Sequence, residues 1–239
     1  MIKSFQKLLC LALLVMLTGC MYHGRLRRGI FNQPAQPERI EASILVLSDK
    51  IIPAQISISD PDSAALYGFT LDVSDAVMVA ATDALGTLFA RADAGVQHIK
   101  DKYNFTAEVK LISKLTRVDC DGSLSNLEQV GARQNGLCTQ VILTLRRVGQ
   151  DKPIGEFSAK RWEVFARPGT ASVVRWINEH TLYLFSPVLI PAYTQLQGNV
   201  LRQILERQIS GNLTQIIEEI SGQKEKFQLF LAQSNATMR

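Results

Sequence analysis

The spacing of the apolar residues changes along the chain, and its last change, from strand-like to helical, most constrains the fold. In the first two thirds, apolar and polar residues alternate, most clearly where Phe105, Ala107, Val109 and Leu111 are separated by polar residues. Such a period of two is typical of strands with one buried side. In the last third, apolar residues recur every three or four positions, as in an amphipathic helix; they are Leu201, Leu205, Ile209, Leu213, Ile216 and Ile220.

The expected order is strands, a helix, a strand, a hairpin and then helices. Because strands and helices do not alternate regularly, the sequence predicts an α+β fold with a mainly antiparallel sheet, helices packed on one face and a long C-terminal amphipathic helix. A helix is expected from Ser74 to about residue 92, and a tight hairpin near residues 149–151. Later helices are expected over 171–185 and, after a break at Pro187 and Pro191, over 192–220. The expected strands cover residues 43–47, 51–58, 67–73, 105–111, 141–146 and 154–165.

The amino terminus has the features of an export signal. Lys3 and Lys7 precede an apolar run, residues 8–17, that is too short to cross a bilayer. The run ends in Leu17-Thr18-Gly19-Cys20, and polar sequence follows. We therefore expect residues 1–19 to be a signal peptide; the alternatives are an uncleaved membrane anchor or a buried helix with an incidental cysteine.

Residues Leu17 to Cys20 resemble the bacterial lipobox. The resemblance implies cleavage before Cys20 and acylation of its sulfur. The three fatty chains would exceed the two signals that stable membrane attachment needs. In lipoproteins that this sequence resembles, an aspartate directly after the cysteine signals retention in the inner membrane. This chain has Met21 at that position. The resemblance thus implies a protein anchored by lipid in the outer membrane and facing the periplasm, with no cofactor besides the lipid on Cys20.

The mature chain is expected to consist of a flexible tether, one folded domain and a tail. Residues 20–41 contain Gly24, Gly29 and two prolines with little periodicity, which indicates a tether. Its arginines are either solvated or lie against anionic lipid headgroups. Residues 42–222 are long enough for a single periplasmic domain. Residues 223–239 are polar and are expected to be a partly ordered tail.

Two cysteines remain in the folded part, Cys120 and Cys138. In an oxidising compartment such a pair has one choice of partner, so we predict a disulfide worth about 3 kcal/mol. Two unpaired thiols in a flexible loop are the alternative. A zinc site is not expected, because no histidine or second cysteine pair lies at ligand spacing.

The sequence offers no signature of catalysis or of nucleic-acid binding. Its 26 basic and 22 acidic residues are nearly balanced, which argues against nucleic acid as a partner. His23, His98 and His180 are isolated, and neither a G-x-S-x-G elbow nor a phosphate-binding glycine loop occurs. We therefore expect a protein that is not an enzyme and holds no metal.

A set of basic and aromatic residues on the predicted hairpin is the candidate partner-binding patch. It comprises Arg146, Lys160, Arg161 and Trp162, which we place on the outer face of the sheet, where they would meet an acidic partner or a glycan. Ordinary solvation of paired strands is the alternative interpretation.

The lipobox, followed over residues 42–222 by this order of elements, resembles small envelope lipoproteins such as the YajG-like lipoproteins and the auxiliary lipoproteins of ABC-type envelope transport systems. The resemblance implies an adaptor or assembly factor for an envelope transport or secretion complex. The alternative is a periplasmic binding module for lipid, glycan or peptidoglycan, which predicts a deep apolar pocket or an aromatic groove. A homo-oligomer is compatible with either function.

Overall fold

The computed structural model describes residues 20–31, 39–48, 55–59, 67–116, 120, 136–164 and 186–237. The expected signal peptide, including Leu17 of the lipobox, and the expected helix over 171–185 lie outside the described residues.

The larger sheet has five strands in the order β5-β2-β6-β7-β8. The strands β5 (Phe89–Gly95), β2 (Ile40–Leu47) and β6 (Phe105–Thr116) are parallel neighbours. From β6 onward, β7 (Gly136–Arg147) and β8 (Pro153–Val164) add antiparallel strands. The predicted hairpin is therefore confirmed as β7 and β8, with Gly149 at a φ of 83° in its turn.

A second sheet has the order β1-β4-β3. The strand β1 (Cys20–Arg25) is parallel to β4 (Tyr67–Asp72), and β3 (Gln55–Ser59) is antiparallel to β4. Buried Phe69 and Leu71 confirm the expected face of this strand. With parallel pairs in both sheets, strand directions are more mixed than the expected mainly antiparallel arrangement.

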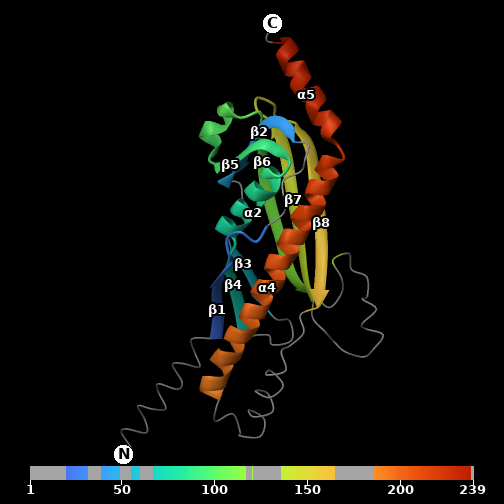
Figure 1. The fold of residues 1–239 in the computed structure, drawn as a ribbon. Helices are drawn as coiled ribbons and strands as arrows, with labels where there is room; N and C mark the ends of the chain where they lie inside the picture. Colours follow the sequence, from blue (N-terminus) through green and yellow to red (C-terminus); the bar gives the residue numbers. More distant parts are fainter. Residues whose placement is uncertain are drawn as a thin grey trace, which may run out of the picture.

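The helices α2 (Ser74–Gly86) and α4 (Ser186–Ser221) cover the same face of the larger sheet. Figure 1 shows α4 running along the length of the molecule to α5 (Lys224–Thr237), while a short 3₁₀ helix, η2 (Gln97–Lys102), lies beside β5. The α+β class, the coverage by helices and the long C-terminal helix are thus confirmed. The apolar stripe predicted on α4 is also confirmed, because each of its six members is at most 1% exposed.

The expected tether at residues 20–41 is wrong in its first half. Residues 20–25 form β1, and the side chains of Tyr22, Leu26 and Phe31 are 3–4% exposed. The neighbouring glycines and arginines conceal this pattern in the sequence. Arg25 and Arg28 form ion pairs with Asp72 and Asp75 instead of extending from a linker.

Three further boundaries differ from the expectations. The helix that begins at Ser74 ends at Gly86, and the residues expected to continue it form β5, because Phe89 and Ala92 join the edge of the sheet. The expected tail forms α5, in which Phe227 is fully buried against Phe89 and Phe105. The long C-terminal helix begins earlier than expected, since α4 starts at Ser186 and continues through Pro187 and Pro191.

The polar face expected on α4 is partly buried. Gln208 is 2% exposed and donates to the carbonyl of Leu137, 2.8 Å away, while Thr139 donates to its Oε1. One turn later, Asn212 donates to the carbonyl of Thr139 at 3.0 Å. Both amides are therefore used to join α4 to β7.

Candidate functional site

Residues of the larger sheet alternate between two environments. The odd-numbered residues of β6 and β7, such as Val109, Leu111, Val141 and Leu143, are buried against the helices. The even-numbered residues point to the opposite side, where β6, β7 and β8 expose Lys110, Lys114, Ser158 and Lys160. We call this side the basic sheet face; its members are Lys110, Ile112, Lys114, Gln140, Ile142, Ser158, Lys160 and Trp162.

The strand register brings the three lysines of this face close together. Lys110 lies beside Ile142, and two residues along β6 Ile112 lies beside Gln140, which in turn pairs with Lys160. The next step pairs Lys114 with Cys138. Neighbouring strands are separated by about 4.8 Å, so the lysines surround Ile112 and Gln140 within the reach of their side chains.

An apolar centre lies among these charges. Ile112 is 40% exposed and lies in the middle strand row between the lysines. Among the described residues of β6, β7 and β8, no acidic residue shares these three cross-strand rows; Glu108 and Glu156 appear in the next row, opposite Thr144. The face therefore offers positive charge around an apolar contact, an arrangement suited to an acidic partner.

Trp162 borders this face on the edge strand β8. Its ring packs over Gly136, where an added Cβ would lie 2.2 Å from the indole, so the flat contact depends on glycine. The indole Nε1 is buried and has no acceptor among the described residues. A buried donor without a partner costs free energy, so this indole position is a local cost of packing the ring over Gly136.

Only half of the predicted patch lies on this face. Lys160 and Trp162 belong to it, whereas Arg161 points to the opposite side and lies over Gly211 of α4. Arg146 is on the correct side, but it is six residues along β7 from Gln140, which is about 20 Å in a strand. It forms an ion pair with Glu108, 3.6 Å away. The alternation along β8 could have separated Arg161 from its neighbours.

Sequence reasoning missed Lys110 and Lys114. Both alternate with apolar residues of β6, and this pattern places them on the outer face of the strand. Their proximity to Lys160 depends on the register across β7, which the sequence did not reveal. The two lysines are separated from the hairpin by more than twenty residues of chain.

The disulfide predicted between Cys120 and Cys138 is present, with the Cα atoms 5.3 Å apart. Cys138 lies in register between Lys114 and Trp162. The bond therefore attaches Cys120 to the border of the basic sheet face. Cys20, the predicted site of acylation, is the first residue of β1 and pairs in register with Tyr67.

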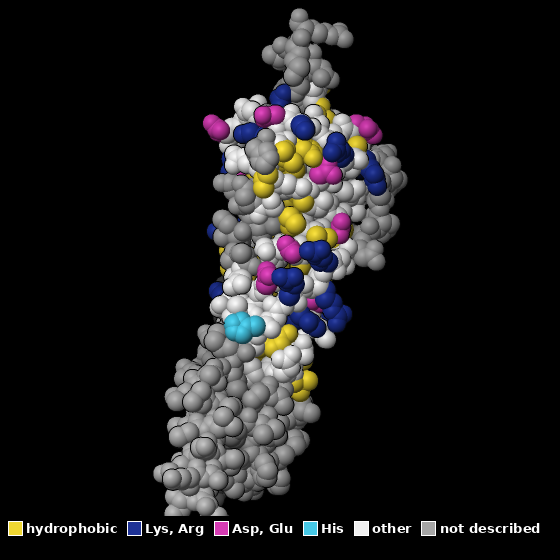
Figure 2. Space-filling model, turned by 90° about the vertical axis from the view of Figure 1, so that its left-hand side faces the viewer, with side chains coloured by type: hydrophobic (Ala, Val, Ile, Leu, Met, Phe, Trp, Pro, Cys, Tyr) yellow, Lys and Arg dark blue, Asp and Glu magenta, His cyan; other side chains and the backbone are white. Residues whose placement is uncertain are grey.

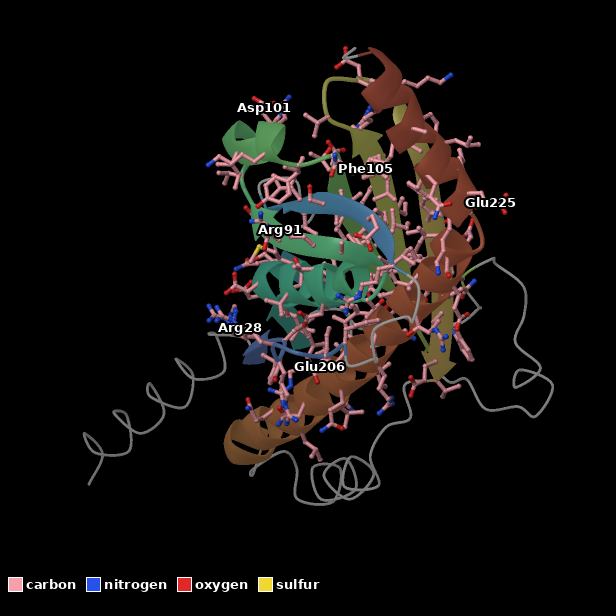
Figure 3. All side chains as sticks on the ribbon, turned by 45° about the horizontal axis from the view of Figure 1, so that its top comes forward. Arg28, Arg91, Asp101, Phe105, Glu206 and Glu225 are labelled. Atoms are coloured by element: carbon pink, nitrogen blue, oxygen red, sulfur yellow. A yellow bond between two sulfur atoms is a disulfide. The ribbon has the colours of Figure 1, made fainter. Side chains whose placement is uncertain are left out.

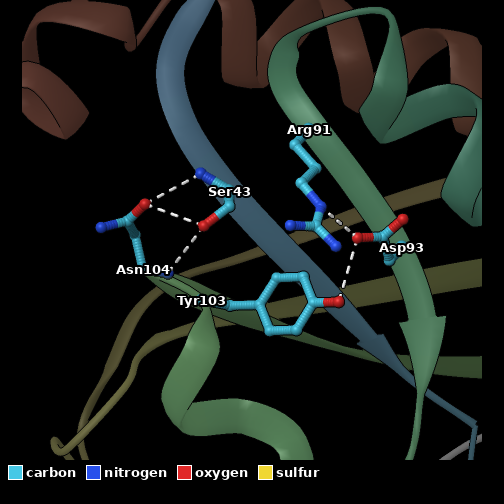
Figure 4. Close-up of polar contacts among 5 residues, drawn as sticks. All are labelled: Ser43, Arg91, Asp93, Tyr103 and Asn104. Carbon is cyan, nitrogen blue, oxygen red and sulfur yellow. Dashed lines mark hydrogen bonds and ion pairs between the residues drawn. The ribbon is translucent and has the colours of Figure 1, made fainter.

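A second polar cluster lies at the opposite edge of the larger sheet, beside β5 (Figure 4). Asp93 accepts from Arg91 Nε at 2.5 Å and from the Tyr103 hydroxyl at 2.9 Å, and the Arg91 guanidinium lies 5.3 Å from the centre of the Tyr103 ring. Loss of solvent and then the hydrogen bond to Asp93 raise the pKa of Tyr103 above its usual value. These groups satisfy one another, so the cluster attaches η2 to β5 and has a structural role.

Ser43 and Asn104 form a hydrogen-bonded contact near the same edge. Asn104 Oδ1 accepts from the Ser43 amide at 2.9 Å and from its hydroxyl at 3.0 Å. The contact joins β2 to the start of β6, next to the irregular pairing of β2 with β5.

In Figure 2, which views the side of the molecule with β1, β5 and α2, basic and acidic side chains are interspersed and form no patch of one sign.

A pocket of about 320 Å³ lies where β2 and β5 end and α2 begins. Its lining contains the hydroxyl residues Ser48 and Ser74, the carboxylate of Asp75 and the apolar Met78. Asp75 already pairs with Arg28 at 2.9 Å. The volume is at the lower end of the range of ligand sites, and one paired carboxylate does not form an acid–base couple.

Among the described residues, no group of three or more histidine, cysteine or acidic side chains is arranged to hold a metal ion. Within the same residues, no helix combines the length and the hydropathy needed to cross a bilayer.

Comparisons with known proteins were made at the level of sequence families, curated proteins and solved structures. No protein-family model and no curated protein matches the chain. The fold is similar to the crystal structure of protein XCC0632 from Xanthomonas campestris, which is assigned to the family DUF330. The similarity covers 85% of this chain and 99% of that one, with 11% sequence identity and a TM-score of 0.37. At this TM-score the likeness supports no inference about function, which must come from the site.

Proposed function

We propose that the protein is a lipid-anchored adaptor of the outer membrane, without enzymatic activity, that faces the periplasm and binds a component of an envelope transport or secretion complex. The anchor in this proposal is an acylated Cys20, and the docking surface is the basic sheet face. The proposal corresponds to the adaptor role that the sequence resemblance implies.

The observation that carries the proposal is the grouping of three lysines around exposed Ile112 on one sheet face. An apolar centre with a charged border is the usual anatomy of a protein–protein interface. The charges favour a partner with acidic groups around an apolar anchor, and they would accelerate its encounter at low ionic strength.

Site-specific photo-crosslinking in native envelopes tests this proposal. A photoreactive amino acid replaces Ile112 at the centre of the face, and in a second strain it replaces Leu229, which is 63% exposed on α5. We expect Ile112, and not Leu229, to form an adduct with a component of an envelope complex. Adducts only with a second copy of this chain, or none, would contradict the proposal.

A charge-reversal variant shows whether the lysines direct this contact. Lys110→Glu, Lys114→Glu and Lys160→Glu together are expected to lower the adduct yield about tenfold, since like charges at an interface cost several times RT.

The matched control makes the same change in charge elsewhere, with Arg39→Glu, Lys102→Glu and Lys152→Glu at three exposed positions. The control is expected to keep the adduct. Equal losses in the two variants would show an effect of net charge and would refute docking at the basic sheet face.

A further inference from the structure

No linker separates Cys20 from the folded domain, because β1 begins at this residue. Cys20 pairs with Tyr67 as the first residue of β1, and two residues later Tyr22 is 4% exposed. If Cys20 carries the lipid of the proposed function, on which this inference rests, the acyl chains are attached directly to a strand. The domain then has a defined orientation on the membrane instead of moving on a tether.

The helix α4 runs in the same direction as β1. The Tyr22 hydroxyl donates to Asn199 Oδ1 at 3.1 Å, and the backbone amide of Arg27 donates to Glu206 Oε1 at 2.9 Å. Figure 3 shows Glu206 on α4 beside the segment that follows β1. From Tyr22 in β1 to Arg27 just after this strand, the contacts on α4 therefore move toward the C-terminal end of the helix.

The start of α4 consequently extends past Cys20. Cys20 precedes Tyr22 by two strand residues, which is about 7 Å. Ser186 precedes Gly198, which lies against the Tyr22 ring, by twelve helical residues, which is about 18 Å. The first turns of α4 thus extend about 10 Å farther than the acylation site. Figure 1 shows this end of α4 extending beyond β1.

The sequence of this projecting end is apolar. Residues 186–201 contain no charged side chain, and the first charge on α4 is Arg202. Three consecutive aliphatic residues, Val188, Leu189 and Ile190, lie in the first turns. Two residues before Gly198, Leu196 is 37% exposed. A bilayer admits such an uncharged helix end at the boundary of headgroups and acyl chains, to a depth of about 5–10 Å.

We infer that Ser186–Tyr193, the first turns of α4, insert into the membrane interface beside the acyl chains of Cys20. The lipid and the helix end then form one two-part anchor. The basic sheet face is level with Gln208, which contacts β7, and is therefore held about 20 Å above the acylation site. This height places the basic sheet face in the periplasm, oriented for a partner.

Fluorescence quenching measures this insertion in the intact lipoprotein. Tryptophan replaces Val188, Leu189 or Ile190 one at a time, and each variant is reconstituted in phosphatidylethanolamine–phosphatidylglycerol vesicles with brominated acyl chains. We expect at least one of the three new tryptophans to lose about half of its emission, as bromine quenches at the interfacial depth. Leu229→Trp on α5 is the matched control at an exposed apolar position and is expected to show no quenching beyond that of the parent.

Photo-crosslinking from diazirine-labelled acyl chains is a second measurement that needs no substitution. Adducts are expected in the peptide that contains Ser186–Tyr193 and not in α5. Absence of both quenching and adducts, in protein whose Cys20 is shown by mass spectrometry to be triacylated, would overturn this inference and leave the proposed anchor intact. An unmodified Cys20 would overturn the proposed function itself.

Discussion

The contact between Gly198 of α4 and Tyr22 of β1 provides a sharp test of the structure. A Cβ added at Gly198 would lie 2.2–2.5 Å from three carbons of the Tyr22 ring, far inside van der Waals contact. The ring has little room to move, because it is 4% exposed, lies 6.3 Å from the Phe69 ring and is hydrogen-bonded to Asn199. Gly198→Ala therefore requires β1 and α4 to separate.

The expected cost follows from three contributions. Alanine in a helix is favoured over glycine by about 1 kcal/mol. Overpacking at a site that cannot adjust costs about 1–3 kcal/mol or more. Loss of the hydrogen bond from Tyr22 to Asn199 removes about 1 kcal/mol. The net expectation for Gly198→Ala is a free energy of unfolding lowered by about 1–3 kcal/mol.

Gly211→Ala is the matched control on the same helix. There the new Cβ would meet the guanidinium of Arg161 at 2.6 Å, but this is the end of a flexible side chain that can move aside. The helix preference of alanine then dominates, so the variant is expected to be between neutral and about 1 kcal/mol more stable.

Urea denaturation of the non-acylated Cys20→Ser chain measures both effects. In a Tyr22→Ala background the clash is absent, so Gly198→Ala is expected to become neutral or stabilising, which gives a coupling energy of at least about 1 kcal/mol in a double-mutant cycle. If Gly198→Ala is as well tolerated as Gly211→Ala in the parent, then β1 is not docked on α4. The orientation of the anchor argued above would then fail with it.

Three other predictions concern the ends of the sheet. Phe227→Ala is expected to lower the free energy of unfolding by about 3–5 kcal/mol, whereas exposed Leu229→Ala changes it by less than about 0.5 kcal/mol in the same denaturation assay. Replacing Cys120 and Cys138 together by alanine is expected to cost about 3 kcal/mol, and the thermal midpoint in reducing buffer should then match that of the parent. Tyr103→Phe tests the raised pKa: protonated Tyr103 stabilises the fold at neutral pH, and this contribution is lost as pH rises above 10 through the folded-state pKa. The parent should therefore lose stability above pH 10 more steeply than the variant.

The sequence was most informative where one face of an element is buried and the other is solvated. Alternation along β6 and the three- to four-residue spacing on α4 follow directly from such burial, and both predictions are confirmed. It was least informative where an element is short and its neighbours are distant in the chain. The strand β1 has few apolar residues, and its pairing with β4 depends on residues more than forty positions away.

Helical spacing also misled where two elements adjoin. Phe89 and Ala92 continue the spacing of α2, yet they pair with β2, because an edge position in the sheet buries Phe89 against Phe105 and Phe227. The same aromatic contact orders α5, whose polar composition indicated a tail. Tertiary packing of one phenylalanine outweighs local propensity in both cases.

The candidate site was half predicted because its residues come from three strands. The hairpin alone identified Lys160 and Trp162, while the contributions of Lys110 and Lys114 needed the register of β6 on β7. The prediction also included Arg161, because it did not take into account that neighbouring residues of a strand point to opposite sides. The side chain of Arg161 lies on the helix-covered side.

The buried amides of α4 fix the position of this helix on the larger sheet. Apolar ridges alone would permit α4 to slide along the sheet by a turn, about 5.4 Å. Gln208 and Asn212 prevent this, because each donates to a defined carbonyl of β7 and would lose its partner in a shifted register. A fixed register of α4 on β7 fixes the height of the basic sheet face above the apolar start of the same helix. Because Tyr22 joins that helix to the strand that begins at Cys20, the proposed membrane anchor and the proposed docking surface would be parts of one rigid arrangement.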